Sequence, residues 1–203
     1  MKVKGEQNSV KKVREILKDK NGILRASDLS EHDIPRVYLS ILEKNGEIQR
    51  VSRGVYATAN SLMDEMISLQ YRYKKTVFSH ETALYLWEFT DRTPLFYSVT
   101  VPSGYNATSL KADGVKVFFI KPELFSLGLT TVKSPHGNDV KTYNVERTVC
   151  DIVRSRNQID VQFVNEALKR YVTRKDKNID LLYNYAAQFR IQKIIRTYLE
   201  VLL

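Results

Sequence analysis

Apolar residues recur at helical spacing near the start of the chain. Val10, Val13 and Leu17 lie three or four positions apart, which is the period of one face of an α-helix. The run follows Asn8-Ser9, side chains that often cap helices, and it stops at Asn21-Gly22, a pair typical of a helix end. The pattern therefore predicts a first helix between these two signals.

Two shorter helices are expected next. Ser27 is predicted to cap the second, with Glu31 near its first turn. Pro35 is expected to open the third, because proline is tolerated at the first helical position. This third helix is predicted to run to about Asn45 and to end at Gly46.

A pair of strands completes the N-terminal pattern. Residues 47–51 and 54–57 alternate in the manner of strands, and Ser52-Arg53-Gly54 joins them as a turn. Three helices followed by a small hairpin are typical of a winged helix-turn-helix, whose last helix enters the major groove of duplex DNA. We expect this domain to span residues 1–59.

One face of the third helix carries the side chains expected to contact DNA. If Leu39, Leu42 and Gly46 face the core, a step of about 100° per residue turns another set outward. That set is Arg36, Val37, Ser40 and Lys44. We expect Arg36 and Ser40 to contact base edges and Lys44 to contact a phosphate.

Three arginines and a tyrosine extend the predicted surface. Arg50 and Arg53 flank the hairpin tip, where guanidinium groups reach phosphates or the minor groove. Arg25 precedes the second helix, and Tyr38 lies at the margin of the outward face. Two other interpretations stay open: these charges only solvate a small domain, or the winged helix binds another protein.

In the remaining chain, residues 60–203, the pattern predicts two helices, then strands, and then further helices. Apolar spacing predicts a helix around 62–73 and a second one after Ser79 as its cap. Aromatic and β-branched runs predict strands, and later amphipathic runs predict helices. The strands are 96–101, 115–120, 129–132 and 140–144, and the helices are 147–154, 161–171, 181–189 and 192–202. We predict an α+β domain with a small mixed sheet and C-terminal helices.

Composition narrows the class of protein. The formal net charge is +9, with 12 basic and 8 acidic residues in 1–59, nine of each in 60–146, and 11 basic and 6 acidic in 147–203. The positive excess at both ends favours a polyanionic partner. No apolar run is long enough for a membrane span and no export signal is visible, so a cytoplasmic protein without membrane contact is expected.

Candidate chemistry in the second part is sparse. His80-Glu81, Asp91-Arg92 and the pair Arg147 and Asp151 are the polar groups that stand out. Arg147 and Asp151 are one turn apart and suit an ordinary ion pair, and His80 suits a capping or core-edge role. The lone Cys150 and three scattered histidines predict no disulfide and no metal site. We therefore expect no enzyme and no cofactor.

Basic residues gather in the last helices. They are Lys169, Arg170, Arg174, Lys175, Lys177, Arg190, Lys193 and Arg196. They could form a second positive surface that touches flanking DNA or competes for a nucleic-acid substrate, or they could be a solvated face.

Several short motifs, in this order and spacing, resemble one family over nearly the whole chain. They are residues 22–29, 46–48, 53–56, 78–84, 91–94, 101–102 and 146–151. This set resembles the AbiEi antitoxins of type IV abortive-infection systems against phage. The resemblance implies repression of the protein's own operon through the N-terminal winged helix. It also implies that the C-terminal domain counters a nucleotidyltransferase-like toxin, without requiring direct contact between the two proteins.

Taken with the residues, the resemblance predicts a double-stranded operator as partner, with two copies of the protein on inverted repeats. From the polar groups singled out above, His80, Arg92, Arg147 and Asp151 are the candidate functional residues of the antitoxin domain. Two alternatives remain: a ligand-responsive winged-helix transcription factor without a toxin, and an enzyme with a DNA-binding appendage.

Overall fold

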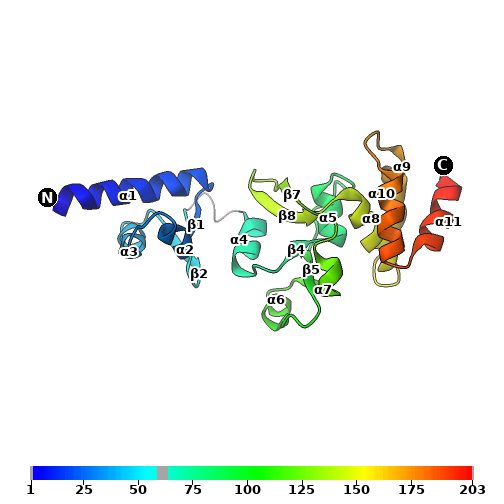
Figure 1. Ribbon diagram of the computed structural model, residues 1–203, viewed down its shortest axis with the longest axis horizontal. Helices are drawn as coiled ribbons and strands as arrows, with labels where there is room; N and C mark the ends of the chain where they lie inside the picture. Colours follow the sequence, from blue (N-terminus) through cyan, green and yellow to red (C-terminus); the bar gives the residue numbers. More distant parts are fainter. Residues whose placement is uncertain (1, 59–63, 203) are drawn as a thin grey trace. The chain divides into compact units, whose positions relative to one another are not determined.

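The computed structural model describes residues 2–58 and 64–202, which fold into helices and two small sheets (Figure 1). The chain divides into two compact units, residues 1–74 with 134–138, and residues 75–133 with 139–203. The predicted domain boundary between 59 and 60 lies outside the described residues and stays a prediction. No helix within the described ranges is long and apolar enough to cross a membrane.

In its described residues, the first unit contains four helices and a three-stranded antiparallel sheet in the order β1-β3-β2. Its elements are α1 (Lys2–Asp19), β1 (Ile23–Arg25), α2 (Ala26–Ser30), α3 (Val37–Lys44), β2 (Gln49–Ser52), β3 (Val55–Ala57) and α4 (Glu65–Arg72). Apolar residues of α1, α2 and α3, among them Val13, Leu29 and Leu42, pack together in its core.

Three predicted helix starts in this unit are wrong. Helix α1 begins at Lys2, so Asn8-Ser9 lie inside it, because the residues before them are mostly good helix formers. The N-cap of α2 is Arg25 and not Ser27. Helix α3 begins at Val37, two residues after Pro35.

One local and one long-range hydrogen bond explain the earlier start of α2. The backbone N–H of Arg25 donates to the Asp28 carboxylate over 2.8 Å, which is one half of a capping box. The backbone N–H of Ala26 donates to the carbonyl of Gly54 in the hairpin turn, also over 2.8 Å. The hairpin therefore takes part in setting where α2 begins.

Helix α4 is tied to the turn at residues 134–138. Asp64 caps the helix by accepting hydrogen bonds from the backbone N–H groups of Met66 and Ile67. Its second carboxylate oxygen accepts from the side chains of Ser134 and Asn138. Asp64 is only 1% exposed, so one buried carboxylate joins two distant segments of the first unit.

The second unit contains a five-stranded mixed sheet in the order β6-β5-β4-β8-β7. Pairs β4–β8 and β5–β6 are parallel, whereas β4–β5 and β7–β8 are antiparallel. The strands are β4 (Val77–Phe78), β5 (Ser98–Pro102), β6 (Lys116–Ile120), β7 (Leu129–Lys133) and β8 (Asp139–Tyr143). The small mixed sheet is thus as expected, with an additional central strand of two residues, β4.

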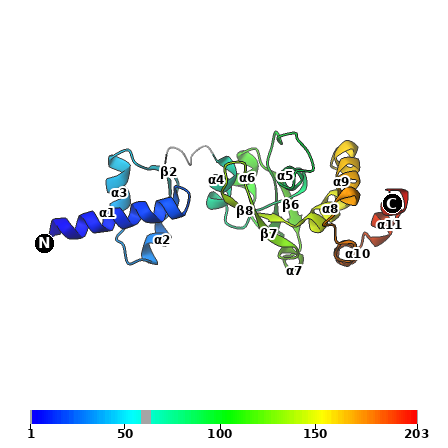
Figure 2. The ribbon, with the colours of Figure 1, turned by 90° about the horizontal axis from the view of Figure 1, so that it is seen from above.

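The helices of this unit follow the sequence-based expectation closely at the C-terminal end. They are α5 (His80–Leu86), α6 (Thr108–Ala112), α7 (Pro122–Phe125), α8 (Val145–Arg154), α9 (Val161–Thr173), α10 (Ile179–Gln188) and α11 (Gln192–Leu202). Helix α8 packs against α5, α9 and α10 (Figure 2). Nine of its ten residues are buried. An α+β fold with C-terminal helices is therefore confirmed.

Candidate nucleic-acid interface

Helix α3 buries one face and exposes the other. Leu39 and Leu42 are 1% and 0% exposed and belong to the core of the first unit. At 100° per residue the opposite face consists of Val37, Ser40, Ile41 and Lys44, and all four are exposed. Arg36, at the N-cap, is exposed as well. The predicted outward set is therefore on the surface, and Ile41 joins it.

The cations of this surface lack acidic partners within the described part of the chain. Arg36, Lys44 and Arg53 are exposed and form no ion pair with any residue in the described ranges. Elsewhere in the same unit, Arg14 pairs with Glu47 and Lys20 pairs with Asp28. An uncompensated cation on a rigid element is available to a phosphate, so α3 and the hairpin offer positive charge outward.

The hairpin β2–β3 turns sharply at Arg53-Gly54. Gly54 has φ +75°, a left-handed conformation that glycine adopts without strain. Arg53 is exposed at this tip, and the Arg50 side chain is exposed with its Nε 3.4 Å from the carbonyl oxygen of Ser52. Both predicted arginines thus lie on the surface of the hairpin.

Arg25 and Tyr38 are less accessible than the sequence implied. The Arg25 guanidinium stacks over the Tyr71 ring of α4 at 4.5 Å, and its Nε is buried without a hydrogen-bond partner. Burial raises the pKa of Tyr71, so the phenol stays neutral beneath the cation. Tyr38 is half-buried and packs against the core.

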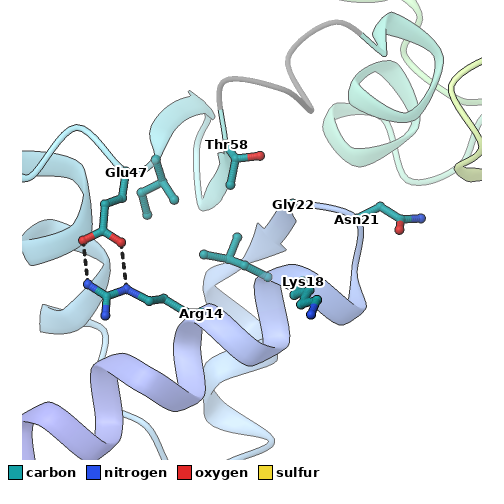
Figure 3. Close-up of a pocket in the computed structure, with 8 residues that line it drawn as sticks. Arg14, Lys18, Asn21, Gly22, Glu47 and Thr58 are labelled. Carbon is teal, nitrogen blue, oxygen red and sulfur yellow. Dashed lines mark hydrogen bonds and ion pairs between the residues drawn. The ribbon is translucent and has the colours of Figure 1, made fainter.

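A surface pocket of about 390 Å³ lies beside the end of α1 (Figure 3). Arg14 and Glu47 face each other there and form two hydrogen bonds of 2.8 and 2.9 Å. This contact lowers the pKa of Glu47 through its hydrogen bonds to Arg14. Because the two charges compensate each other, the pocket does not add to the positive surface.

His80 is fully buried in the second unit, deeper than a core-edge position. Its two ring nitrogens lie 2.9 and 3.0 Å from the hydroxyls of Ser79 and Ser155, and its ring stacks on Phe118 with centroids 3.4 Å apart. Its φ of +51° is unusual for a residue with a side chain. Burial, followed by the charge of Arg154, holds the pKa of His80 well below its usual range.

Arg147 and Asp151 form their ion pair in the interior and not on the surface. Arg147 Nε donates to Asp151 over 2.9 Å, and both side chains are 0% exposed. Arg147 Nη1 also donates to the carbonyls of Leu124 and Leu127. The small stabilisation typical of an exposed ion pair does not describe this pair, because breaking a buried pair leaves an uncompensated charge.

The surroundings of Arg147 are closely packed. Its guanidinium lies between the rings of Tyr143 and Phe189, 4.1 and 4.4 Å from their centroids. A Cβ at Gly128 would come within 2.7 Å of the Arg147 Cβ. Arg147 is thus positioned to hold α8 against the segment before β7.

Arg92 lies apart from these buried residues, on an exposed loop. With Leu95, Phe96 and Lys116 it lines a pocket of about 380 Å³. Leu95 and Phe96 are 93% and 65% exposed and form an apolar tip. The sequence pattern places Phe96 in a strand at 96–101, but β5 begins only at Ser98. The structure therefore does not bring the four antitoxin-domain candidates to one site.

Only some cations of the second basic surface are without an ion pair in the described part of the chain. Arg170 pairs with Glu166 and Asp91, and Arg174 pairs with Asp176 over 2.7 Å. The residues of this set that are exposed and form no ion pair within the described chain are Lys169, Lys175, Arg190, Lys193 and Arg196. Lys177 donates to the carbonyl of Arg174.

Other candidate chemistry is absent from the described residues. Those residues contain no cluster of three His, Cys, Asp or Glu side chains suited to a metal ion. Cys150 is fully buried, and burial raises the pKa of its thiol. It therefore packs as a small apolar residue.

Part of the chain is similar to a known family, and its fold is similar to a solved structure. Residues 11–59 match the family described as "Transcriptional regulator, AbiEi antitoxin". No curated protein matches the chain. The fold is similar to the crystal structure of the RV2827C protein from Mycobacterium tuberculosis, with a TM-score of 0.56 and 14% identity over 89% of this chain and 71% of that one. At that identity the likeness concerns the fold alone.

The family match covers α2, α3 and the hairpin, which carry the exposed cations described above. Its description names a regulator and an antitoxin, and it is not a family of enzymes. Residues 11–59 are therefore similar to the AbiEi antitoxin family of transcriptional regulators.

Proposed function

We propose that residues 1–59 form a winged helix-turn-helix that binds operator DNA, with α3 in the major groove and the hairpin β2–β3 as the wing. The observation that carries this proposal is the set of exposed cations at Arg36, Lys44 and Arg53, which have no acidic partner among residues 2–58 and 64–202. Each lies on α3 or at the hairpin tip, the two elements that contact duplex DNA in such modules.

The proposed contacts divide by type. Arg36 and Ser40, near the start of α3, contact base edges. Lys44, Arg50 and Arg53 contact phosphates, or the minor groove in the case of the wing. Two further residues have supporting roles: Tyr38 borders the contact, and Arg25 reaches DNA only if it leaves the ring of Tyr71.

We further propose that the protein represses its own toxin-antitoxin operon in the cytoplasm and belongs to a type IV phage-resistance system. Residues 60–203, as the antitoxin domain, then counter a nucleotidyltransferase-like toxin without requiring direct contact. The regulator and antitoxin family supports this assignment, and the resemblance of the later motifs supplies the kind of toxin. Two copies on inverted repeats would match the symmetry of such operators.

The proposal is tested by the salt dependence of binding to the DNA upstream of the gene. Arg36→Ala, Arg50→Ala and Arg53→Ala together should weaken binding by one to several orders of magnitude. They should also reduce the slope of log K against log salt by about two, because each lost phosphate contact removes roughly 0.9. A matched variant with Lys11, Lys12 and Lys18 changed to alanine removes equal charge from exposed positions of α1.

If both variants lost affinity to a comparable extent, the effect would depend on net charge alone and not on the proposed surface. Binding of the first variant that matches the wild type, or no preference of the wild type for this DNA over random fragments, would refute the proposed surface.

A further inference from the structure

The centre of the exposed α3 face is apolar. Val37 is 57% exposed and Ile41 is 37% exposed, whereas Leu39 and Leu42 on the other face are buried. Single exposed apolar residues are common on proteins and by themselves need no explanation. These two lie one helical turn apart, however, in the middle of the face that the proposed function directs at bases.

Charge surrounds this pair on the same surface. Arg36 and Lys44 lie at the two ends of α3, exposed and without an ion pair among the described residues, and Ser40 lies between Val37 and Ile41. A rim of cations with an apolar centre fits a groove that has phosphates at its edges and an apolar group on its floor. The major groove of DNA has such a group in only one place, the C5-methyl of thymine.

The position along the helix also fits base contact. In helix-turn-helix modules the N-terminal residues of the second helix reach the base edges, and Val37 is the first residue of α3. Four residues of helix rise about 6 Å, while successive bases of one strand are about 3.4 Å apart. Val37 and Ile41 can therefore reach methyl groups about two base-pair steps apart.

We propose that Val37 and Ile41 determine operator specificity by contacting thymine methyl groups in the major groove. This inference rests on the proposed function and adds a chemical group of the operator that the charged residues do not select. Cationic and hydroxyl side chains recognise phosphates and hydrogen-bonding edges, whereas only an apolar side chain gains by covering a methyl group.

The test replaces individual thymines by deoxyuridine, which pairs identically and lacks only the methyl group. The probe is the DNA fragment upstream of the gene, titrated with the full-length protein. For the wild type, each contacted position should lose about fourfold in affinity, the value of one buried methyl group. At one such position Val37→Ala should weaken binding to the thymine duplex and abolish sensitivity to deoxyuridine, and Ile41→Ala should do so at another.

Val161→Ala provides the matched control, because Val161 is 63% exposed in the second unit; it should keep the wild-type sensitivity at every position. Circular dichroism checks that the α3 variants are folded. Preferential, salt-dependent binding by the wild type with no deoxyuridine effect, or with the same effect in all variants, would overturn the inference and leave the proposed function intact.

Two other outcomes also overturn the inference. If the wild type has no preference for this DNA, the proposed function fails as well. If Val37→Ala and Ile41→Ala weaken self-association, measured by sedimentation without DNA, and leave the deoxyuridine effect unchanged, the face is an interface between copies of the chain.

Discussion

His80 and Arg147 show that polar residues can be part of a core when most of their hydrogen bonds are made. His80 has a serine hydroxyl at each ring nitrogen and an aromatic ring against its face. Arg147 donates to one carboxylate and two carbonyls between two aromatic rings. Burying such groups costs free energy unless their hydrogen bonds are made, and here nearly all are made inside the second unit.

The buried His80 predicts a pH dependence of stability. Its pKa is lowered by burial and by neighbouring cations, whereas in the unfolded chain it is about 6.5. Below about pH 6.5 the unfolded chain therefore binds a proton that the native protein does not, and the free energy of unfolding should fall as the pH falls. The contribution is at most about 1.4 kcal/mol per pH unit, and it is fully present above the unfolded pKa.

The measurement is urea unfolding at pH 7.5 and 5.5, followed by the fluorescence of Trp87, the single tryptophan. Asparagine tolerates a positive φ, so His80→Asn is the comparison. The wild type should lose about 1 kcal/mol more than this variant between the two pH values. Equal losses would mean that His80 does not titrate differently on folding.

At the scale of elements, helix ends are set in part by groups that lie far away in sequence. Helix α2 starts where Asp28 and the carbonyl of Gly54 receive backbone N–H groups. Helix α4 starts at Asp64, whose other oxygen is bound by Ser134 and Asn138. A helix end can thus serve as a joint between segments, because its unpaired N–H groups need acceptors.

Asp64→Ala should destabilise the first unit by about 2–4 kcal/mol, because it removes a helix cap and leaves two buried donors unpaired. Chemical denaturation followed by circular dichroism measures the loss. Asp64→Asn keeps an acceptor for the amides of Met66 and Ile67 and should lose clearly less. Unchanged stability in the alanine variant would contradict the role assigned to this carboxylate.

At the scale of the whole molecule, the candidate functional residues of the two proposed activities lie in separate units. The exposed cations of α3 and the hairpin belong to the first unit, whereas the buried His80, Arg147 and Asp151 and the exposed Leu95 belong to the second. If each unit carries its own activity, damage to one surface should leave the other activity in place.

Full-length protein with alanine at Arg36, Arg50 and Arg53 should therefore lose repression of its own promoter and still protect cells from the toxin. Repression is measured with a promoter reporter. Protection is measured by growth when this protein and the proposed toxin are expressed from unrelated promoters. The wild type and the α1 lysine variant are controls. Loss of protection at equal protein level would show that antitoxin action depends on DNA binding.

Much of the secondary structure follows from local pattern alone. Helices α8 to α11 and strands β5 to β8 lie within a few residues of their predicted ranges, because amphipathic periodicity is a property of neighbouring residues. The outward orientation of Arg36, Ser40 and Lys44 follows from the same geometry. The exposure of Ile41 is not predicted, because an apolar residue between Leu39 and Leu42 is expected in the core.

What the sequence by itself determined is the order of elements, the α+β class and the cationic character of α3 and the hairpin, since these depend on residues close together in the chain. Only the tertiary structure decided the short strands β1 and β4, the start of α2, and the burial of His80 and Arg147. A two- or three-residue strand has no periodicity of its own and exists through its partners. A buried ion pair and an exposed one have the same sequence spacing and differ only in what the rest of the chain packs over them.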